Sequence, residues 1–256
     1  MNVSEELIRS IVEKVVAEAA GCSSKCGFQK QVDPSGVIGV KTSTVELEPF
    51  EGRNDVKLKD VATLEEAPRM GCGIMELDHT SFEWTLTYDE YDLVLDGTLE
   101  IEIDGRTISF KAPFRRVTMT EAIREKTGYD ITGQSEEQLR EACRRLGVEV
   151  DETMGKGKLI DAIFGQYCEE ELIQPTFVCD YPIEMSPLCK RHRDNPDLTE
   201  RFELFVNGKE LCNAYSELND PIDQLERFQE QLRLLEKGDD EAMFIDMDFV
   251  RALEYG

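Results

Sequence analysis

Two glutamates beside a tight-turn signal are the residues of this sequence with the clearest chemical potential. The dipeptide Asn207-Gly208 favours a two-residue turn of type I′, which pairs Phe205 with Glu210 across the flanking strands. Because side chains two apart on a strand share a face, Glu203 projects on the same side as Glu210. Neighbouring carboxylates repel unless a cation lies between them, and oxygen ligands suit Mg²⁺ that bridges nucleotide phosphates. The alternative is that both are solvated surface acids.

A second acidic group lies in the front part of the chain, beside the single tryptophan, Trp84. It consists of Tyr88, Asp89, Glu90 and Asp92. Such a group could bind a cation or act as acid and base, but acidic side chains also keep the edge of a sheet soluble. The second interpretation is favoured, and no residue of the chain is assigned a catalytic role.

The eight cysteines and two histidines do not indicate a metal centre. Cys22 and Cys26 form the one close pair, with a second pair and a nearby histidine both missing, which does not match a zinc site. His79 and His192 are the only histidines, so a centre with several histidine ligands is excluded.

The composition argues against nucleic-acid and membrane partners. The 256 residues carry a formal net charge of −25, and a surface this acidic repels phosphate backbones, so tight nucleic-acid binding by this chain alone is not expected. Arg144-Arg145 and the basic residues of 190–193 are interpreted as ordinary surface. No apolar run approaches the roughly 18 residues of a membrane span, and no signal peptide is visible. The protein is therefore expected to be cytoplasmic, with reduced cysteines.

The first 36 residues predict an amphipathic helix and a linker. Apolar residues recur at helical spacing over residues 4–20, with Ser4 as N-cap and Gly21 as the stop. Two interpretations stay open: a helix docked on its own domain, or a short docking helix for a partner or shell surface.

Residues 37–108 alternate between apolar and polar side chains, as antiparallel strands do. Strand-like segments lie at 37–40, 45–47, 56–58 and 82–86. The strongest run has two alternating segments around Asp96-Gly97 and ends at Asp104-Gly105, which are hairpin signals of a sandwich or barrel.

From about residue 110 the pattern predicts helices with interspersed strands. Helices are expected from Thr118 or Thr120 to 126, from a capping box at Ser135 and Gln138 to 146, over 158–171, from Pro221 to 237, and from near Asp246. Residues 176–179 predict a strand, ahead of the hairpin at Asn207-Gly208. The fold class is α+β, with domains at 1–36, 37–108 and 109–256.

The front half resembles the ethanolamine-utilisation cupin, through residues 82–97 and a glutamate seven residues before the glycine of the turn. The resemblance covers about residues 37–108. It implies a partial cupin barrel with open edges and an association with bacterial microcompartments. If the helix at residues 4–20 is a docking helix, a microcompartment shell is the partner surface expected for it. Metal cupins add histidines from the same strand pair, whereas Tyr88 and other non-ligands stand here, so no metal is expected.

The back half resembles the C-terminal catalytic region of bacterial class II lysyl-tRNA synthetase. Several separated blocks carry the resemblance in order, over residues 112–128, 172–177, 180–188, 199–220, 238–243 and 252–256. It implies an incomplete antiparallel synthetase sheet with flanking helices. It also implies ATP as substrate, Mg²⁺ held by Glu203 and Glu210, and a lysine pocket of Glu210, Asn213, Tyr215 and Glu217.

Strict alternation along the strand would send Asn213, Tyr215 and Glu217 to the face opposite Glu210. A bulge near Leu211-Cys212 restores a common face, and bulges are frequent beside active sites, so the sequence predicts a bulge there. In that arrangement Glu217 would pair with the ε-ammonium of lysine, Tyr215 would cover its aliphatic stem, and Asn213 would bond its amino-acid head.

The expected function is that of a lysine-tRNA ligase fragment that does not act alone. By the resemblance, the whole enzyme activates lysine with ATP and transfers it to tRNA. Motifs 1, 2 and 3 and the anticodon-binding barrel find no match, and Arg115-Arg116 is not the arginine of motif 2. The alternatives are a cupin-like microcompartment protein with a passenger C-terminal half, and a chimera of two genes joined near residues 105–110.

Overall fold

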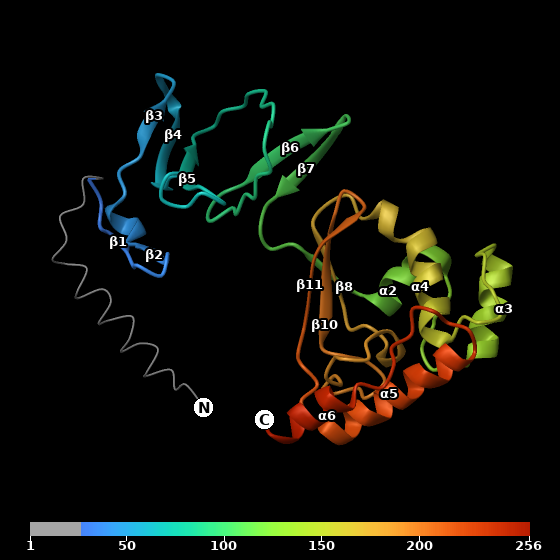
Figure 1. The fold of residues 1–256 in the computed structure, drawn as a ribbon. Helices are drawn as coiled ribbons and strands as arrows, with labels where there is room; N and C mark the ends of the chain where they lie inside the picture. Colours follow the sequence, from blue (N-terminus) through green and yellow to red (C-terminus); the bar gives the residue numbers. More distant parts are fainter. Residues whose placement is uncertain (1–26) are drawn as a thin grey trace. The chain divides into compact units, whose positions relative to one another are not determined.

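The computed structural model describes residues 27–256, which divide into two compact units between Glu90 and Tyr91 (Figure 1). The helix predicted over residues 4–20, its proposed shell contact and the Cys22–Cys26 pair lie outside the described residues. The division falls earlier than the domain boundary expected at residues 108–109.

The front unit contains two small antiparallel sheets and no closed barrel among its described residues. Strands β1 (Lys30–Val32) and β2 (Ile38–Val40) pair with each other, and the 3-10 turn η1 (Thr42–Thr44) follows. Strands β3 (Glu48–Phe50), β4 (Arg53–Ala62) and β5 (Cys72–Leu77) form a meander with β4 in the centre. The open edges expected of a partial barrel are therefore present.

Residues 78–98 form no strand, which corrects the prediction of strands at 82–86 and 93–95. Leu93 and Leu95 are 68% and 79% exposed, so their alternation defines no buried face. Trp84 contacts Phe50 and Phe82, with ring centroids 6.1 and 5.9 Å apart. The physical reason for the difference is the lack of a pairing strand for this stretch within the described residues.

Strands β6 (Leu99–Ile103) and β7 (Arg106–Phe110) form a hairpin that belongs to the back unit. Asp104 and Gly105 both have positive φ (52° and 74°), so this dipeptide forms the turn of the hairpin, as one of the two predicted turn signals indicated. The other signal, Asp96-Gly97, connects no paired strands among the described residues. Gln174 holds β7 to the rest of the unit. Its Oε1 accepts from the Ser109 amide at 3.0 Å, and its Nε2 donates to the Thr107 carbonyl at 2.8 Å.

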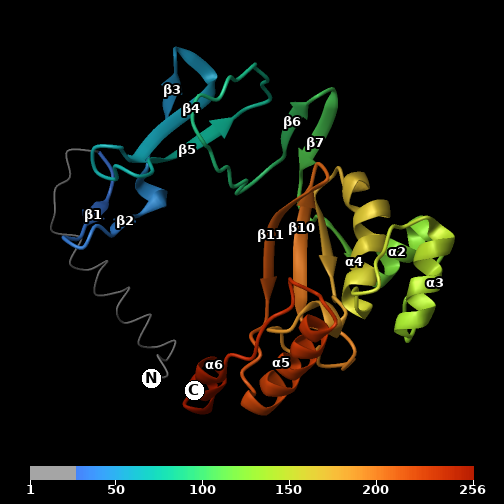
Figure 2. The same ribbon diagram turned by 45° about the vertical axis from the view of Figure 1, so that its right-hand side comes forward.

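The main sheet of the back unit has the strand order β11-β10-β9-β8. Its strands β10 and β11 lie side by side in Figures 1 and 2. Strand β10 (Arg201–Val206) pairs antiparallel with both β9 (Thr176–Cys179) and β11 (Lys209–Tyr215). Strand β8 (Arg115–Thr118), which the sequence did not predict, pairs parallel with β9, so the expected antiparallel sheet is mixed at this edge. Strand β11 forms the other edge.

The back unit has five α-helices in the described part of the chain, and side-chain caps explain where four of them begin. Helix α3 (Glu136–Leu146) starts with the predicted capping box at Ser135. Helix α2 (Met119–Thr127) starts at Thr118, one of the two caps that the sequence left open, and Thr118 forms a capping box with Glu121. Helix α4 (Lys156–Tyr167) ends earlier than expected, and the 3-10 turn η2 (Glu169–Glu171) follows it. Helices α5 (Pro221–Glu236) and α6 (Met247–Glu254) start at Asp220 and Asp246 caps. The 3-10 turn η3 (Ile183–Met185) lies between β9 and β10.

The core of the back unit lies between one face of the sheet and helices α2–α4. Phe205 of β10 is 2% exposed and meets Phe164 of α4 edge to face, with centroids 5.7 Å apart. The other face of the sheet carries a row of aromatic rings instead: Phe177 contacts Phe114 at 6.1 Å and Phe202 at 5.2 Å. Within the described part of the chain, every helix is too short or too polar to traverse a lipid bilayer.

Candidate functional site

The β10–β11 turn has the geometry that the sequence predicts. Asn207 and Gly208 both have positive φ (53° and 71°), and Val206 pairs with Lys209, as in a type I′ turn. The amides of Asn207 and Gly208 donate to the carbonyls of Ile173 and Leu172, at 2.9 and 3.0 Å. The turn is therefore fixed on the segment that follows α4, at the end of the sheet opposite α5 (Figure 1).

The predicted bulge is present, and it consists of Leu211. Phe205 pairs with Glu210, but the next residue of β10, Leu204, pairs with Cys212, so Leu211 has no partner across the hairpin. Beyond the bulge, Glu203 pairs with Asn213. Because paired residues share a face, the extra residue brings Glu210 and Asn213 to the same side of the sheet as Glu203.

Glu203 is buried and held by three donors. The Tyr181 hydroxyl donates to its Oε2 at 2.7 Å, and the Asn213 amide nitrogen donates to its Oε1 at 3.1 Å. The Arg201 guanidinium forms an ion pair with Oε1 as well. Burial raises the pKa of Glu203, and the nearby Glu210 carboxylate raises it further, while Tyr181 and Arg201 oppose this rise. The carboxylate therefore lies where a positive charge would be favourable.

Glu210 is exposed, and its side chain has no hydrogen-bond partner among the described residues. Its charge acts on its neighbours all the same. The pKa of Glu169, in η2, is raised by burial first and then by nearby carboxylates that include Glu203 and Glu210. Acidic side chains of η2, β10 and β11 thus repel one another in one region of the unit.

The other predicted lysine-pocket residues are only partly assembled. Tyr215 pairs with Arg201 across the hairpin, so it lies on the same face of the sheet as Glu203. Its side chain is 39% exposed. Glu217 lies beyond the end of β11, where it forms an isolated bridge with Cys189, and its side chain is exposed. Asn213 already binds Glu203, so one of its amide hydrogens is used within the protein.

The donor set of this face fits Mg²⁺. It offers carboxylate oxygens, which Mg²⁺ prefers, and Mg²⁺ is commonly bound by one or two carboxylates together with water and substrate phosphates. No group of three or more histidine, cysteine, aspartate or glutamate side chains among the described residues is arranged to hold a metal.

Tyr181 and Arg201 contact Glu203 but were not among the site residues predicted from the sequence. Arg201 precedes Glu203 by two residues, so the same alternation that aligns the glutamates could have revealed it. Tyr181 is 2% exposed and reaches Glu203 from a loop after β9. Its position depends on Asp180, whose φ of +57° turns the chain at this point, and no sequence signal indicates that turn.

The front acidic group shows no comparable arrangement. Trp84 and Tyr88 are 48% and 58% exposed, and the group lies in the stretch without strands. The basic clusters are engaged with acids: Arg144 pairs with Glu141, and Arg191 pairs with Asp223.

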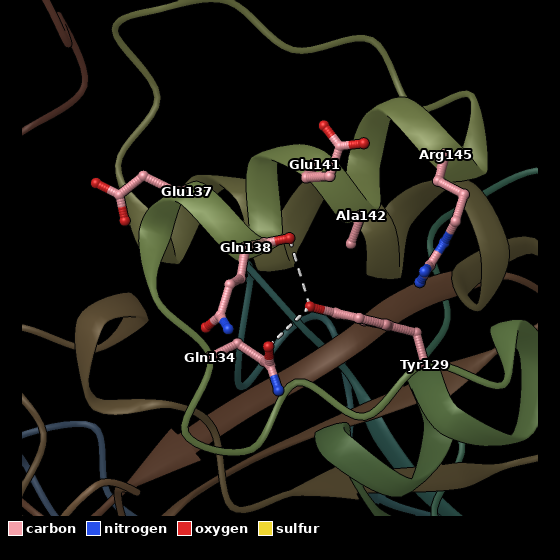
Figure 3. Close-up of a pocket in the computed structure, with 7 residues that line it drawn as sticks. All are labelled: Tyr129, Gln134, Glu137, Gln138, Glu141, Ala142 and Arg145. Carbon is pink, nitrogen blue, oxygen red and sulfur yellow. Dashed lines mark hydrogen bonds between the residues drawn. The ribbon is translucent and has the colours of Figure 1, made fainter.

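Two hollows of the back unit are lined by residues other than the predicted ones. One, of about 330 Å³, is lined by Tyr129 and by residues of α3 and the preceding loop (Figure 3). There the Tyr129 hydroxyl donates to Gln134 at 3.2 Å, and Arg145 lies 5.4 Å from the centroid of the Tyr129 ring. Another hollow, of about 410 Å³, is lined by residues 190–191, 218–220 and Asp223. None of the predicted site residues lines either hollow.

Comparison with known proteins confirms both resemblances. The family described as "Ethanolamine utilisation protein EutQ" matches residues 3–114. The lysine–tRNA ligase of Porphyromonas gingivalis (strain ATCC BAA-308 / W83) is 63% identical over 183 residues, which are 70% of this chain and 32% of the relative. The corresponding enzyme of Christiangramia forsetii is 61% identical over 183 residues, with the same coverage. That of Azobacteroides pseudotrichonymphae is 58% identical over 185 residues, or 70% of this chain and 37% of the relative.

The chain spans about a third of the length of the curated relatives it matches. The two similarities also overlap. An uninterrupted match over 70% of the chain that reaches its C-terminal end must begin well before residue 114, so it includes the β6–β7 hairpin. This hairpin is therefore common to both matches.

Proposed function

We propose that the back unit carries part of the ATP and lysine site of a lysine–tRNA ligase, and that this chain alone does not charge tRNA. The observation that carries the proposal is the Leu211 bulge, which gathers Glu203, Glu210, Asn213 and Tyr215 on one face of a hairpin. The similarity to lysine–tRNA ligases supports the choice of substrates.

In this proposal Glu203 and Glu210 hold Mg²⁺. The ion, when bound, supplies positive charge that neutralises the phosphates of ATP. The chain's own contribution is to hold two carboxylates at fixed places on a rigid hairpin. Glu203 is set by its three donors, and Glu210 extends into solvent from the residue before the bulge.

The lysine ligand would lie along β11. Glu217, with Glu210, pairs with its ammonium groups, and the Tyr215 ring covers the aliphatic stem. Asn213 donates its second amide hydrogen, or accepts through its carbonyl oxygen, to bind the amino-acid head.

The expected lack of activity follows from the charges of this face. Phosphate and adenylate chemistry needs preorganised positive groups at the reacting phosphate, and this electrostatic contribution is commonly the largest in catalysis. Arg201 is the arginine next to the carboxylates, but Glu203, the Met185 carbonyl and Ser186 already occupy it. It is therefore not free to hold a phosphate.

Ligand-dependent stabilisation tests the residual site. We expect Mg-ATP with lysine to raise the melting temperature of the whole chain, and we expect Glu210→Ala to abolish this rise. At a hundredfold excess over Kd the stabilisation is about 2.7 kcal/mol. Glu236→Ala, an exposed glutamate of α5, is the matched control and keeps the rise. An equal rise in the Glu210→Ala protein would contradict the proposal.

Lysine-dependent exchange of pyrophosphate into ATP tests the lack of activity. We expect no exchange above background from this chain with Mg-ATP and lysine. Exchange that requires lysine and disappears in Glu203→Gln would show instead that the chain is an active enzyme.

We also propose that the two halves were joined from separate genes within the β6–β7 hairpin. The observation that favours this origin is the overlap of the two similarities on that hairpin. Sequencing independent preparations of the source DNA across codons 95–120 tests it. An unbroken reading frame in single long reads that contain flanking genes would establish a natural fusion and overturn the proposed joining.

A further inference from the structure

The two proposed ion ligands differ in how firmly the protein holds them. Glu203 is 7% exposed and engaged by Tyr181, Arg201 and Asn213, whereas Glu210 is exposed and has no side-chain partner among the described residues. This difference leads to an inference that rests on the proposed function and concerns the residues behind Glu203.

Tyr181 is held both at its ring and at its backbone carbonyl. Its ring is 2% exposed and lies under the Arg201 guanidinium, 4.6 Å from carbon to centroid. Its carbonyl accepts from the amide and the hydroxyl of the fully buried Thr199, at 2.8 and 2.9 Å. A phenol held at its backbone and over its ring can direct its hydroxyl to one carboxylate oxygen only.

Arg201 is anchored as firmly. Its Nη1 donates to the Met185 carbonyl at 3.1 Å and to the Ser186 hydroxyl at 3.0 Å, and Ser186 is 2% exposed. The remaining terminal nitrogen is the one that pairs with Glu203. Because a guanidinium is planar and rigid, fixing one of its nitrogens fixes the direction of the other.

The accepted hydrogen bonds leave Glu203 little freedom. A carboxylate has about four acceptor positions. Oε1 accepts from Arg201 and Asn213, and Oε2 accepts from Tyr181. One acceptor position remains, on Oε2, so Glu203 can offer an ion a single oxygen without breaking a contact.

We propose that Arg201 and Tyr181 are positioning residues that hold Glu203 as a fixed, one-oxygen ligand, while the unrestrained Glu210 adapts to the ion. Residues behind a ligand commonly change metal affinity by ten- to a hundredfold when they are altered. The function of the pair is to present the oxygen, and neither residue contacts the ion or a substrate.

Titration of the whole chain with Mn²⁺ alone, followed by electron paramagnetic resonance of the free ion, tests the proposal. The difference between wild type and Glu203→Gln defines the ions bound at this site. We expect Tyr181→Phe, which keeps the ring and removes one hydroxyl, to weaken that binding about tenfold. Tyr129→Phe removes a hydroxyl that also donates to a side chain but lies in the α2–α3 loop, so it should leave binding within twofold.

Substitutions of Arg201 test the proposal by whether they tighten or weaken Mn²⁺ binding. If this arginine acted only through its positive charge, Arg201→Gln would tighten Mn²⁺ binding, and Arg201→Lys would change nothing. The positioning role predicts weaker binding in both variants, with far-UV circular dichroism showing that each is folded. Tyr181→Phe keeps the test decisive should an Arg201 variant fail to fold.

The outcomes separate this inference from the proposed function. Unchanged Mn²⁺ binding in Tyr181→Phe, or wild-type binding that does not depend on Glu203, would overturn the positioning role. Calorimetry with Mg-ATP addresses the proposed function by itself. Suppose that the wild-type chain binds no Mg-ATP but binds Mn²⁺, and that Tyr181→Phe weakens the Mn²⁺ binding. This result would reject the ligase site and support the positioning role of Tyr181 and Arg201.

Discussion

Residues 82–95 and residues 201–215 show similar strand-like patterns, but only the second stretch forms strands. The apolar side chains of the first, such as Leu95, are exposed, whereas Phe205 in the second is covered by α4. The difference teaches that alternating apolar and polar residues indicate which face of a strand could be buried. The alternation alone does not bury that face. A covering layer or a pairing strand must be present, and the described part of the chain supplies one only for the back sheet.

The largest expected effect comes from truncating Phe205, the side chain of β10 that α4 covers. Phe205→Ala leaves a cavity under α4 and should cost about 3–5 kcal/mol of unfolding free energy. Urea unfolding followed by circular dichroism at 222 nm measures it, because the described helices all belong to the back unit. The fluorescence of Trp84, in the front unit, should keep its midpoint. A cost below about 1 kcal/mol would mean that α4 does not stabilise the sheet in this way.

An intermediate effect is expected from ion pairs of different burial. Asp223 accepts from Arg191 at 3.0 and 3.1 Å and from Arg227 at 3.0 Å, and Arg227 is buried. Asp223→Asn should cost about 2 kcal/mol at neutral pH, as loss of charged hydrogen bonds does. Asp55→Asn, whose partner Arg53 is more exposed, is the matched front-unit variant and should cost less because solvent screens that pair.

The Asp223 effect should depend on pH in a defined direction. Hydrogen bonds from Arg191 lower the pKa of Asp223 below its ordinary value of 3.8. A group with a lowered folded-state pKa stabilises the protein above its unfolded-state pKa, and this contribution is lost as pH falls through the folded value. The difference between wild type and Asp223→Asn should therefore be constant near neutrality and shrink below about pH 4. A difference that grows in acid would contradict the assignment.

The smallest expected effect on stability comes from Leu95, an exposed residue of the stretch 82–95. Leu95→Ser should change the unfolding free energy by less than about 0.5 kcal/mol, since Leu95 is 79% exposed. Its visible consequence should be weaker self-association, measured by light scattering at rising concentration, because exposed apolar patches promote association. A large loss of stability would show that residues 82–95 are covered in solution.

The sequence was sufficient for the parts of the site that depend on local rules. Asn207-Gly208 predicted the turn, and Ser135 and Asp246 marked helix starts. The bulge at Leu211 was predicted from strand alternation together with the pocket residues that the family resemblance implies. The sequence was insufficient where contacts join distant residues. Tyr181 meets Glu203 from 22 residues away, and β8 pairs with β9 in parallel across three helices. Such pairings depend on the whole sheet and not on any local pattern.

The Leu211 bulge has a second consequence, for how the molecule meets copies of itself. Strand β11 is an open sheet edge whose seven residues are all exposed, which makes it a template for another chain. The unpaired Leu211 breaks the regular spacing of amide and carbonyl groups along this edge strand, and Lys209 adds a charge at one end of the strand. The irregularity that aligns the carboxylates thus also discourages fibrous stacking, so a variant with a regular edge strand should be the more prone to aggregate.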